Sequence, residues 1–429
     1  MPQSPRRPAL TALALALALG ACGTDLTNPA SGGASAADGQ AALKGSLVAV
    51  GKAIFHDQNL SLNRNQACVS CHDPAWGFSS PESRINANGA VMPGSVRERF
   101  GSRRPPSAAY ATMSPIISYN AEDGTYVGGN FWDGRATGER LGIPAAEQAL
   151  APFVNPVEQA LPDPACAVFR ASRGTYGGLY RNAFGTAVDQ IAFPRNTDGL
   201  CAVEGSTIAL SAPDRALMLL EYDKMGRAIA SFEHSPEVNQ FSSKYDAVLA
   251  GQTTFTPLEA SGFAMFNTRA NCSACHPSAG PKALFTDFTY DNIGVPANPK
   301  NPITRTNPLF RDLGVGGFFN QPGEWGKMKV PTLRNLDKRA RPGLAKSFMH
   351  NGAFKSLDEV VHFYNTRDVL PACETTPSPV FGVNCWPAPE VTENVNTDEL
   401  GDLGLTPDQE LAVVAFLRTL NDGWVAGQP

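Results

Sequence analysis

The chain is 429 residues long, which is enough for two domains, and charged residues make up 17% of it. Its formal net charge of -5 leaves no basic stripe, so nucleic acid is excluded as a partner. The 40 glycines and 35 prolines indicate a fold with long, turn-rich connections.

The first 22 residues are typical of a bacterial targeting signal. Arg6 and Arg7 precede the apolar run "ALTALALALALGA", which is shorter than the ~20 residues that a membrane span needs. A Leu-Gly-Ala-Cys sequence then ends at Cys22, as in a lipoprotein processing site; an ordinary cleaved signal is the alternative. Residues 23–42 read as a flexible tether, and the folded body is expected to begin near Leu43. We therefore expect a protein in the periplasm of a Gram-negative bacterium, held to a membrane only through its N-terminal lipid.

Four segments place their apolar residues at helical spacing. The first leads into a cysteine motif, and the second lies between the two halves of the chain. The third begins with a capping box formed by Thr256 and Glu259, with Pro257 in its first turn. Thr406 and Pro407 start the fourth in the same way. Because strand patterns are scarce, we expect a mainly α fold with long loops and with helices in the segments 43–57, 214–233, 255–266 and 405–422.

A Cys-x-x-Cys-His sequence occurs once in each half of the chain, after a predicted helix. Two thiols spaced three residues apart can bond to the two vinyl groups of one haem, and the adjacent histidine then reaches the iron. A zinc site would need a second cysteine or histidine pair nearby, and a redox dithiol would not need the histidine. We therefore predict two covalently bound c-type haems, held by Cys68, Cys71 and His72 and by Cys272, Cys275 and His276.

The cysteine count fits an exported protein. Of nine cysteines, one is assigned to the lipid and four to the haems, which leaves an even number. In an oxidising compartment an even remainder indicates disulfides. Proximity in the sequence favours the pairs Cys166–Cys201 and Cys373–Cys385, each closing a loop.

The first haem is expected to keep an open coordination position. The chain has six histidines and none lies between His72 and His234, so the loop after the first motif offers no second histidine ligand. Met92 and Met113 lie in that loop and are chemically able to bind iron, but packing is the commoner role of methionine. Peroxide chemistry needs an open position on the iron.

Seven segments of the sequence follow one another in the order found in one protein family. With them the chain resembles the bacterial di-haem cytochrome c peroxidase and MauG superfamily from about residue 45 to its C-terminus. The resemblance implies two cytochrome c-like domains, 43–250 and 251–429, with one haem each and with the block between Cys166 and Cys201 as an insertion. The segments are "GKAIFHDQNLS", "ACVSCHDPAWGFS", "RRPPSAAY", "FWDGRA", "EQALAPFVNPVE", "VPTLRNL" and "SFMHNGAFKSLDEVV".

The resemblance also implies the ligands of the second haem. Peroxidases of the family place a methionine fourteen residues beyond the histidine of a His-Asp-Gly-like turn, and MauG-like enzymes place a tyrosine there. Here the turn begins at His350 and the count reaches Tyr364, so His276 and Tyr364 would bind the second iron. A phenolate is a hard anion that favours ferric and ferryl iron; a packed core tyrosine is the alternative. The segment "HFYNTRDVLPAC" further resembles the MbnH group, MauG relatives associated with copper-protein maturation.

Four further residues match functional positions of the family. Trp132 corresponds to a tryptophan that lies between the haems and passes electrons or holes, although a core aromatic would look the same. Gln148, Pro152 and Glu158 match residues that lie over the first haem. Glu158 would move the protons of peroxide, and Gln148 would hydrogen-bond the bound oxygen. A surface carboxylate is the alternative for Glu158.

Calcium binding is left open by the sequence. The family binds one calcium between its domains with the asparagine of an Arg-Asn-x-Pro segment, and here the segment is Arg103-Arg104-Pro105-Pro106. Arg104 in place of the asparagine removes an oxygen ligand and adds positive charge, although backbone carbonyls and waters could still bind the ion.

The resemblance implies an enzyme that takes hydrogen peroxide at the haem on His72. The oxidising equivalents would spread through Trp132 to the second haem in a bis-ferryl state. That state would oxidise an aromatic residue, preferably tryptophan, of a periplasmic partner, for which a copper-binding protein is expected. Two alternatives stand beside it: a cytochrome c peroxidase that reduces peroxide with electrons from a small cytochrome, and a non-catalytic electron-transfer protein with both haems six-coordinate.

Overall fold

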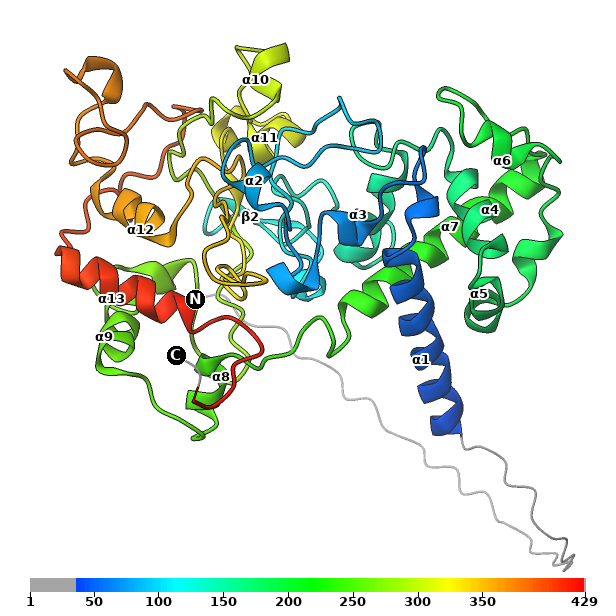
Figure 1. The fold of residues 1–429 in the computed structure, drawn as a ribbon, viewed down its shortest axis with the longest axis horizontal. Helices are drawn as coiled ribbons and strands as arrows, with labels where there is room; N and C mark the ends of the chain where they lie inside the picture. The colour runs from blue at the N-terminus through cyan, green and yellow to red at the C-terminus, as the bar shows by residue number, and fades with distance from the viewer. Residues whose placement is uncertain (1–35, 428–429) are drawn as a thin grey trace, which may run out of the picture. The chain divides into compact units, whose positions relative to one another are not determined.

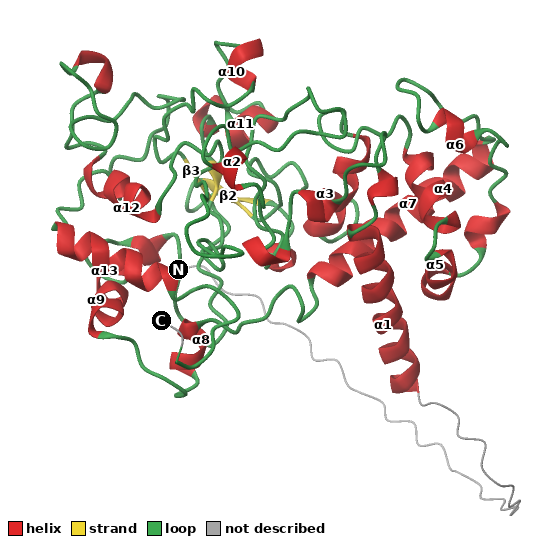
Figure 2. Cartoon of the chain, in the orientation of Figure 1, coloured by secondary structure: helices red, strands yellow, loops and turns green. Residues whose placement is uncertain are grey.

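Regular structure in the chain is mostly helical, as Figure 2 shows, and long loops join the helices. The computed structural model describes residues 36–427, with side chains from Lys44 onward. In this part of the chain the strands form two antiparallel pairs: β1 (Ser118–Asn120) with β2 (Thr125–Val127), and β3 (Tyr290–Asp291) with β4 (Met328–Lys329). The expected mainly α class is therefore confirmed.

The first helix, α1 (Ala36–Phe55), begins earlier than expected. Residues 36–42 were predicted to be part of the tether, and this is wrong, because they continue the helix toward the N-terminus. Alanine is the best helix former, and the sequence "AADGQAAL" is rich in it. The predicted signal segment, Cys22 and residues 23–35 lie outside the described residues.

Helix α1 crosses the long helix α7 (Ala212–Glu233) at a glycine. A Cβ added to Gly51 would lie 1.9 Å from the carbonyl oxygen of Ala228, so only glycine permits this approach. Phe55 and Phe232 pack edge to face beside the crossing, with ring centroids 5.3 Å apart. Helices α3 (Pro144–Val154) and α4 (Pro164–Arg173) pack against the other faces of α7 (Figure 1).

The C-terminal half repeats this arrangement with α9 (Pro257–Phe266) and α13 (Pro407–Arg418), which lie side by side in Figure 1. Both helices begin with the expected Thr-Pro start and a complete capping box. A Cβ added to Gly262 would lie 1.9 Å from the carbonyl oxygen of Ala412. The last helix thus packs against the helix before the second cysteine motif.

Buried hydrophobic side chains form two large clusters. One draws on residues between Val50 and Val238, and the other on residues between Tyr245 and Leu420. A small third cluster combines Ile117 and Tyr126 with residues of the later half. Residues 42–429 form one compact unit, so the division near residue 250 stays a prediction.

The remaining helical segments are short. Each Cys-x-x-Cys-His motif begins with a 3-10 turn that starts at its first cysteine. None of the described helices is long and apolar enough to cross a membrane. The further α-helices are α2 (Ser83–Asn86), α5 (Gly177–Phe184), α6 (Thr197–Leu200), α8 (Lys244–Leu249), α10 (Ile303–Thr306), α11 (Gly314–Phe318) and α12 (Leu357–Thr366). The 3-10 turns are Gln58–Leu60, Cys68–Ser70, Pro74–Trp76, Ala111–Met113, Ala187–Gln190, Cys272–Ala274, Pro322–Glu324 and Cys373–Thr375.

Two disulfides join the cysteine pairs that the sequence favoured. Cys166 of α4 is bonded to Cys201, directly after α6, with the Cα atoms 5.5 Å apart. Cys373 is bonded to Cys385 and closes a loop that follows α12. The first disulfide joins the two ends of the block that was interpreted as an insertion, which contains most of α4 together with α5 and α6.

Candidate active site

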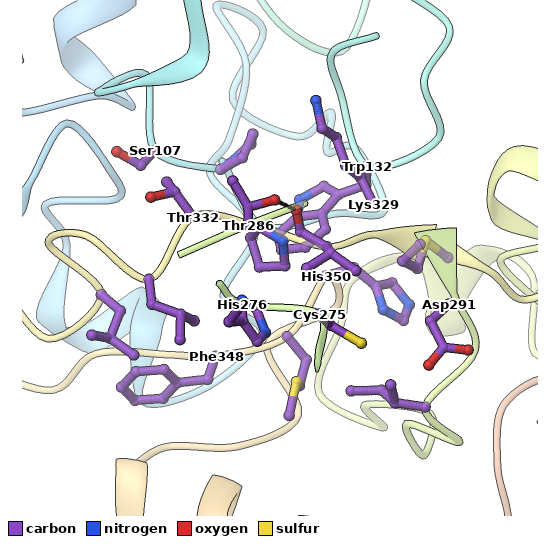
Figure 3. A pocket seen from close by; sticks show the side chains of 18 of the residues that line it. Ser107, Trp132, Cys275, His276, Thr286, Asp291, Lys329, Thr332, Phe348 and His350 are labelled. Carbon is purple, nitrogen blue, oxygen red and sulfur yellow. Dashed lines mark hydrogen bonds between the residues drawn. The ribbon is translucent and has the colours of Figure 1, made fainter. Parts of the chain in front are cut away.

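Two cavities in the structure are lined by the two cysteine motifs. They enclose about 2090 and 980 Å³ of space, open mouths included. The larger is lined by Cys272, Cys275 and His276, and Figure 3 shows it from close by. The smaller is lined by Cys68 and Cys71. His72, Arg104, Phe131, Trp132 and Gln148 line both, so motifs about 200 residues apart in the sequence lie at adjoining cavities.

Each motif folds into a tight turn that aims its histidine into the cavity. The backbone N–H of His72 donates to the carbonyl of Cys68, and that of His276 to the carbonyl of Cys272, both at 2.9 Å. Nδ1 of His72 lies 3.1 Å from the carbonyl oxygen of Phe78, and Nδ1 of His276 lies 2.7 Å from that of Phe285. Because a carbonyl can only accept, Nδ1 carries the proton and Nε2 keeps a free lone pair for a metal.

The chemistry of both cavities fits a haem. Burial lowers the pKa of His72 and of His276, so both imidazoles are neutral and ready to bind iron. The four cysteines of the motifs are the free cysteines of the described chain, and burial raises the thiol pKa of Cys71 and Cys272 to about 12. No group of three or more His, Cys, Asp or Glu residues in the described part of the chain is placed to hold a bare metal ion.

Three of the residues expected over the first haem line the smaller cavity: Gln148, Pro152 and Glu158. Gln148 and Pro152 are one turn apart on α3, so they share a face. Pro152 has no N–H to continue the helix, and α3 ends at Val154. The chain then turns back, with the N–H of Gln159 donating to the carbonyl of Pro152 at 3.1 Å, and this return brings Glu158 to the cavity wall.

Glu158 has the properties of a group that handles protons. Its Oε2 atom is buried and has no hydrogen-bond partner. Burial raises the pKa of its carboxyl, with the charge of Arg135 acting in the opposite direction. A buried carboxyl with a free oxygen can give a proton to, or take one from, a small molecule in the cavity. The alternative of a surface carboxylate is therefore wrong.

The two methionines considered as ligands of the first iron differ in their position relative to the smaller cavity. Met92 lines the smaller cavity, and its sulfur accepts a hydrogen bond from Oγ of Ser80 at 3.3 Å. Met113 lines neither cavity. Among the described residues, His72 is the only histidine that lines the smaller cavity.

A second buried acid in the smaller cavity was missed by the sequence analysis. Glu233, the last residue of α7, has an Oε2 atom without a hydrogen-bond partner, and burial raises its pKa to about 8. The signal was present in the spacing, since Glu233 continues the buried stripe of Tyr222, Gly226 and Ile229 on α7. The cavity therefore holds two carboxyl groups whose pKa values are raised by burial.

Tyr364 lines the larger cavity from helix α12. Ser356 and Glu359 form a capping box that starts this helix, and Leu357, Val360 and Tyr364 line the cavity from one face. Burial, with the neighbouring thiols of Cys275 and Cys272, raises the pKa of the Tyr364 phenol. A phenolate here would need a positive partner, which ferric iron supplies.

The same cavity contains a thioether that the sequence did not single out. Met349 lines it from the residue directly before His350. Its backbone lies in the left-handed region, with φ 67°, and its carbonyl accepts from Nε of Arg104 at 3.2 Å. The larger cavity thus offers a phenol and a thioether as oxygen and sulfur donors.

Trp132 lines both cavities, and Figure 3 shows it in the larger one. Its indole Nε1 donates to the carbonyl of Arg104 at 2.9 Å, and its own carbonyl accepts from the N–H of Lys329 at 2.9 Å. Its ring packs edge to face on His350, with centroids 6.4 Å apart. A buried tryptophan whose indole nitrogen and backbone carbonyl are both hydrogen-bonded is held in one orientation.

Comparisons with known proteins agree with this geometry. Residues 45–254 match the family model described as di-haem cytochrome c peroxidase. The methylamine utilization protein MauG of Paracoccus denitrificans is 34% identical over 88% of this chain and 88% of its own. The diheme peroxidase BthA of Burkholderia thailandensis is 28% identical with a TM-score of 0.64, covering 88% of this chain and 86% of its own. A MauG-like protein associated with microbial copper homeostasis shares the fold, with 22% identity, a TM-score of 0.58, and coverage of 88% and 89%.

The fold and the two adjoining cavities define a di-haem protein with cytochrome c-like architecture. The chain belongs to the di-haem cytochrome c peroxidase and MauG family. It is accordingly a peroxidase-type oxidoreductase that works with two haems and takes hydrogen peroxide as its oxidant.

Proposed function

We propose that this enzyme uses hydrogen peroxide to oxidise an aromatic side chain, preferably tryptophan, of a periplasmic partner protein. One observation carries the proposal: Tyr364 lines the cavity that also contains Cys272, Cys275 and His276. The phenol of Tyr364 would supply an anionic oxygen donor to a haem held there, which would suit an iron that stores oxidising equivalents and would suit poorly an iron that accepts electrons from a high-potential cytochrome.

The haems are proposed to be attached covalently through the two cysteine pairs, and when bound they supply peroxide cleavage and storage of its oxidising equivalents. The protein's own groups handle the protons. Peroxide gives one proton to the buried carboxyl system of the smaller cavity, and Glu158 returns a proton to the leaving oxygen, which departs as water. Gln148 orients the bound oxygen with its amide. Two electrons taken from the partner, with two protons, balance the reduction of peroxide to two waters.

Trp132 is proposed as the residue through which charge passes between the two cavities. It is the aromatic side chain fixed by hydrogen bonds at both its indole and its backbone where the cavities adjoin. A rigid, buried indole changes its surroundings little when it loses an electron, which favours fast transfer.

Location and partner are part of the proposal. A lipid on Cys22 would tether the enzyme in the periplasm, where disulfides such as Cys166–Cys201 persist. A copper-binding protein is the proposed partner class, on the resemblance of "HFYNTRDVLPAC" to the MbnH group.

The test is the optical response of the diferric protein to one equivalent of peroxide. Both haems should be oxidised at once, without prior reduction of either. Activity that appears only after one haem has been reduced would instead support the cytochrome c peroxidase, for which the thioether of Met349 in the larger cavity is the favouring observation. A resting spectrum without a high-spin ferric band would support the electron-transfer protein.

A further inference from the structure

Three lysines of the chain hold their ammonium groups inside cages of oxygen atoms. Each donates to three oxygens, and these are carbonyl, hydroxyl or amide oxygens, never carboxylates. Lys329 reaches Ser114 Oγ, Gly129 O and Asn130 Oδ1; Lys346 reaches Trp76 O, Asn335 O and Lys338 O; Lys355 reaches Asn86 O, Asn88 O and Gly352 O.

The cages join the two halves of the chain. All three lysines come after residue 250, and every cage includes at least one oxygen from before it. The cage of Lys329 is built wholly from the earlier half. The cage of Lys346 combines the carbonyl of Trp76, at 3.0 Å, with two carbonyls of the later half. Each ammonium group is therefore a cross-link between segments far apart in the sequence.

Burying a cation among neutral oxygens is costly unless the cation is fully coordinated. Lys346 is 3% exposed, and burial lowers its pKa well below the usual value. Burial also lowers the pKa of Lys329 to about 7. Carbonyl, amide and hydroxyl oxygens are the ligands that calcium takes from proteins. The lysine cages thus have the donor set of a hard-cation site, and Nζ of each lysine occupies the place that the cation would take.

Arg104 adds a fourth buried cation at the same place. Its Nε donates to the carbonyl of Met349 and its Nη1 to Oγ of Ser79, both at 3.2 Å, so the guanidinium also bridges the two halves. No carboxylate of residues 44–427 contacts it, and burial lowers its pKa to about 10. Its carbonyl binds the indole of Trp132, and Lys329 binds the carbonyl of the same residue. The Arg104 guanidinium lies over the Trp132 ring, 5.7 Å from its centroid, and Nζ of Lys329 already occupies the nearby oxygens of Gly129 and Asn130. These residues therefore do not fit calcium.

We infer that Arg104, Lys329 and Lys346 take the structural place of a divalent cation between the two halves, and that the working enzyme holds Trp132 without bound calcium. The inference concerns how the halves are joined and does not depend on which substrate is oxidised.

The first test is the metal content of the holoenzyme. Protein desalted into metal-free buffer should contain far less than one calcium per chain by elemental analysis. EGTA should change neither the melting temperature nor the optical spectrum of the haems. One calcium per chain that EGTA removes, with a lowered melting temperature or a changed spectrum, would overturn the inference.

The second test removes one cage cation. Lys329→Met keeps the aliphatic stem and removes the ammonium group, and it should lower the melting temperature of the holoenzyme by more than about 5 °C. Lys52→Met is the control, because Lys52 binds the carboxylate of Glu237 within the earlier half. An unchanged melting temperature in Lys329→Met would overturn the cross-linking role. If Lys329→Met does not fold, its loss of stability is already larger than that of the control variant. The metal analysis of the unaltered enzyme then still decides whether calcium is bound.

Discussion

The N–H of Lys329 donates to the carbonyl of Trp132 at 2.9 Å, so the end of β4 holds the tryptophan that lines both cavities. Lys329 and Trp132 come from different halves of the chain, 197 residues apart in the printed numbering. The position of the indole is therefore set by the way the two halves meet. A substitution at their junction should change the position of Trp132 before that of other cavity residues.

The ligand of the second iron is tested by replacing Tyr364. In Tyr364→Met a soft thioether takes the place of a phenolate, so the reduction potential of that haem should rise by on the order of hundreds of mV. Spectroelectrochemical titration measures the shift. Peroxide should then oxidise the variant only after one haem has been reduced. Tyr119→Phe, at an exposed tyrosine, is the control, and equal potentials in Tyr364→Met and the unaltered enzyme would show that Tyr364 does not bind iron.

Glu158 is expected to be needed for peroxide cleavage. Glu158→Gln keeps the shape of the side chain but cannot give up or take a proton, so the second-order rate with peroxide should fall by about 10²–10⁴-fold. Stopped-flow absorbance of the haems gives this rate. Glu204→Gln, at a surface residue paired with Arg99, should leave it unchanged. A rate within twofold of the unaltered enzyme in Glu158→Gln would exclude the proposed role.

Glu233 should make the stability of the enzyme depend on pH. Its folded-state pKa of about 8 lies above the ordinary value of 4.5, so the folded protein binds the proton more tightly than the unfolded chain. The stability from the protonated carboxyl is fully present below about pH 4.5 and is lost as the pH rises through about 8. Each unit of pKa shift corresponds to about 1.4 kcal/mol.

Glu233→Gln removes this titration. A plot of melting temperature against pH from 4.5 to 8 should therefore be flatter for the variant than for the unaltered enzyme. Glu139→Gln changes an exposed carboxylate and is the control. If the two variants give parallel curves, Glu233 is not protonated in the folded protein.

The helix crossings should tolerate no side chain. In Gly262→Ala the new Cβ would lie 1.9 Å from the carbonyl oxygen of Ala412, so α9 and α13 must separate, at a cost of about 3 kcal/mol in the free energy of unfolding. Denaturant unfolding followed at the haem absorbance measures the loss.

Gly45→Ala provides the comparison within a helix. Gly45 lies in α1 with nothing within 4 Å of an added Cβ, so alanine there should stabilise the protein by up to about 1 kcal/mol. Equal effects of Gly45→Ala and Gly262→Ala would mean that helix propensity, not close packing, governs both sites.

The sequence predicted those parts of the site whose chemistry demands a fixed spacing. A haem held by two thioether bonds and an adjacent ligand would require Cys68, Cys71 and His72 to be nearly contiguous, so the motif is visible without a structure. The capping boxes of α9 and α13 were predictable for the same reason, since they are local hydrogen bonds. Sequence proximity also sufficed for both disulfides.

Residues that act through long-range packing were not predictable. Glu233 and Met349 line the cavities only because α7 and the turn before His350 fold against them. The oxygen cages of Lys329 and Lys346 are made largely of backbone carbonyls, which leave no mark in the sequence. The start of α1 at Ala36 was missed because a stretch rich in alanine and glycine was interpreted as a tether.

The Nδ1 atoms of the two motif histidines, His72 and His276, make the same kind of hydrogen bond to a backbone carbonyl. Phe78 and Phe285, whose carbonyls bind Nδ1 of His72 and His276, both have left-handed backbones, with φ 56° and 55°. The electron-donating strength of the two imidazoles is consequently tuned by one and the same kind of acceptor. A difference in redox potential between the two irons would then come from the lengths of these two contacts, 3.1 and 2.7 Å, and from the residues on the other side of each cavity.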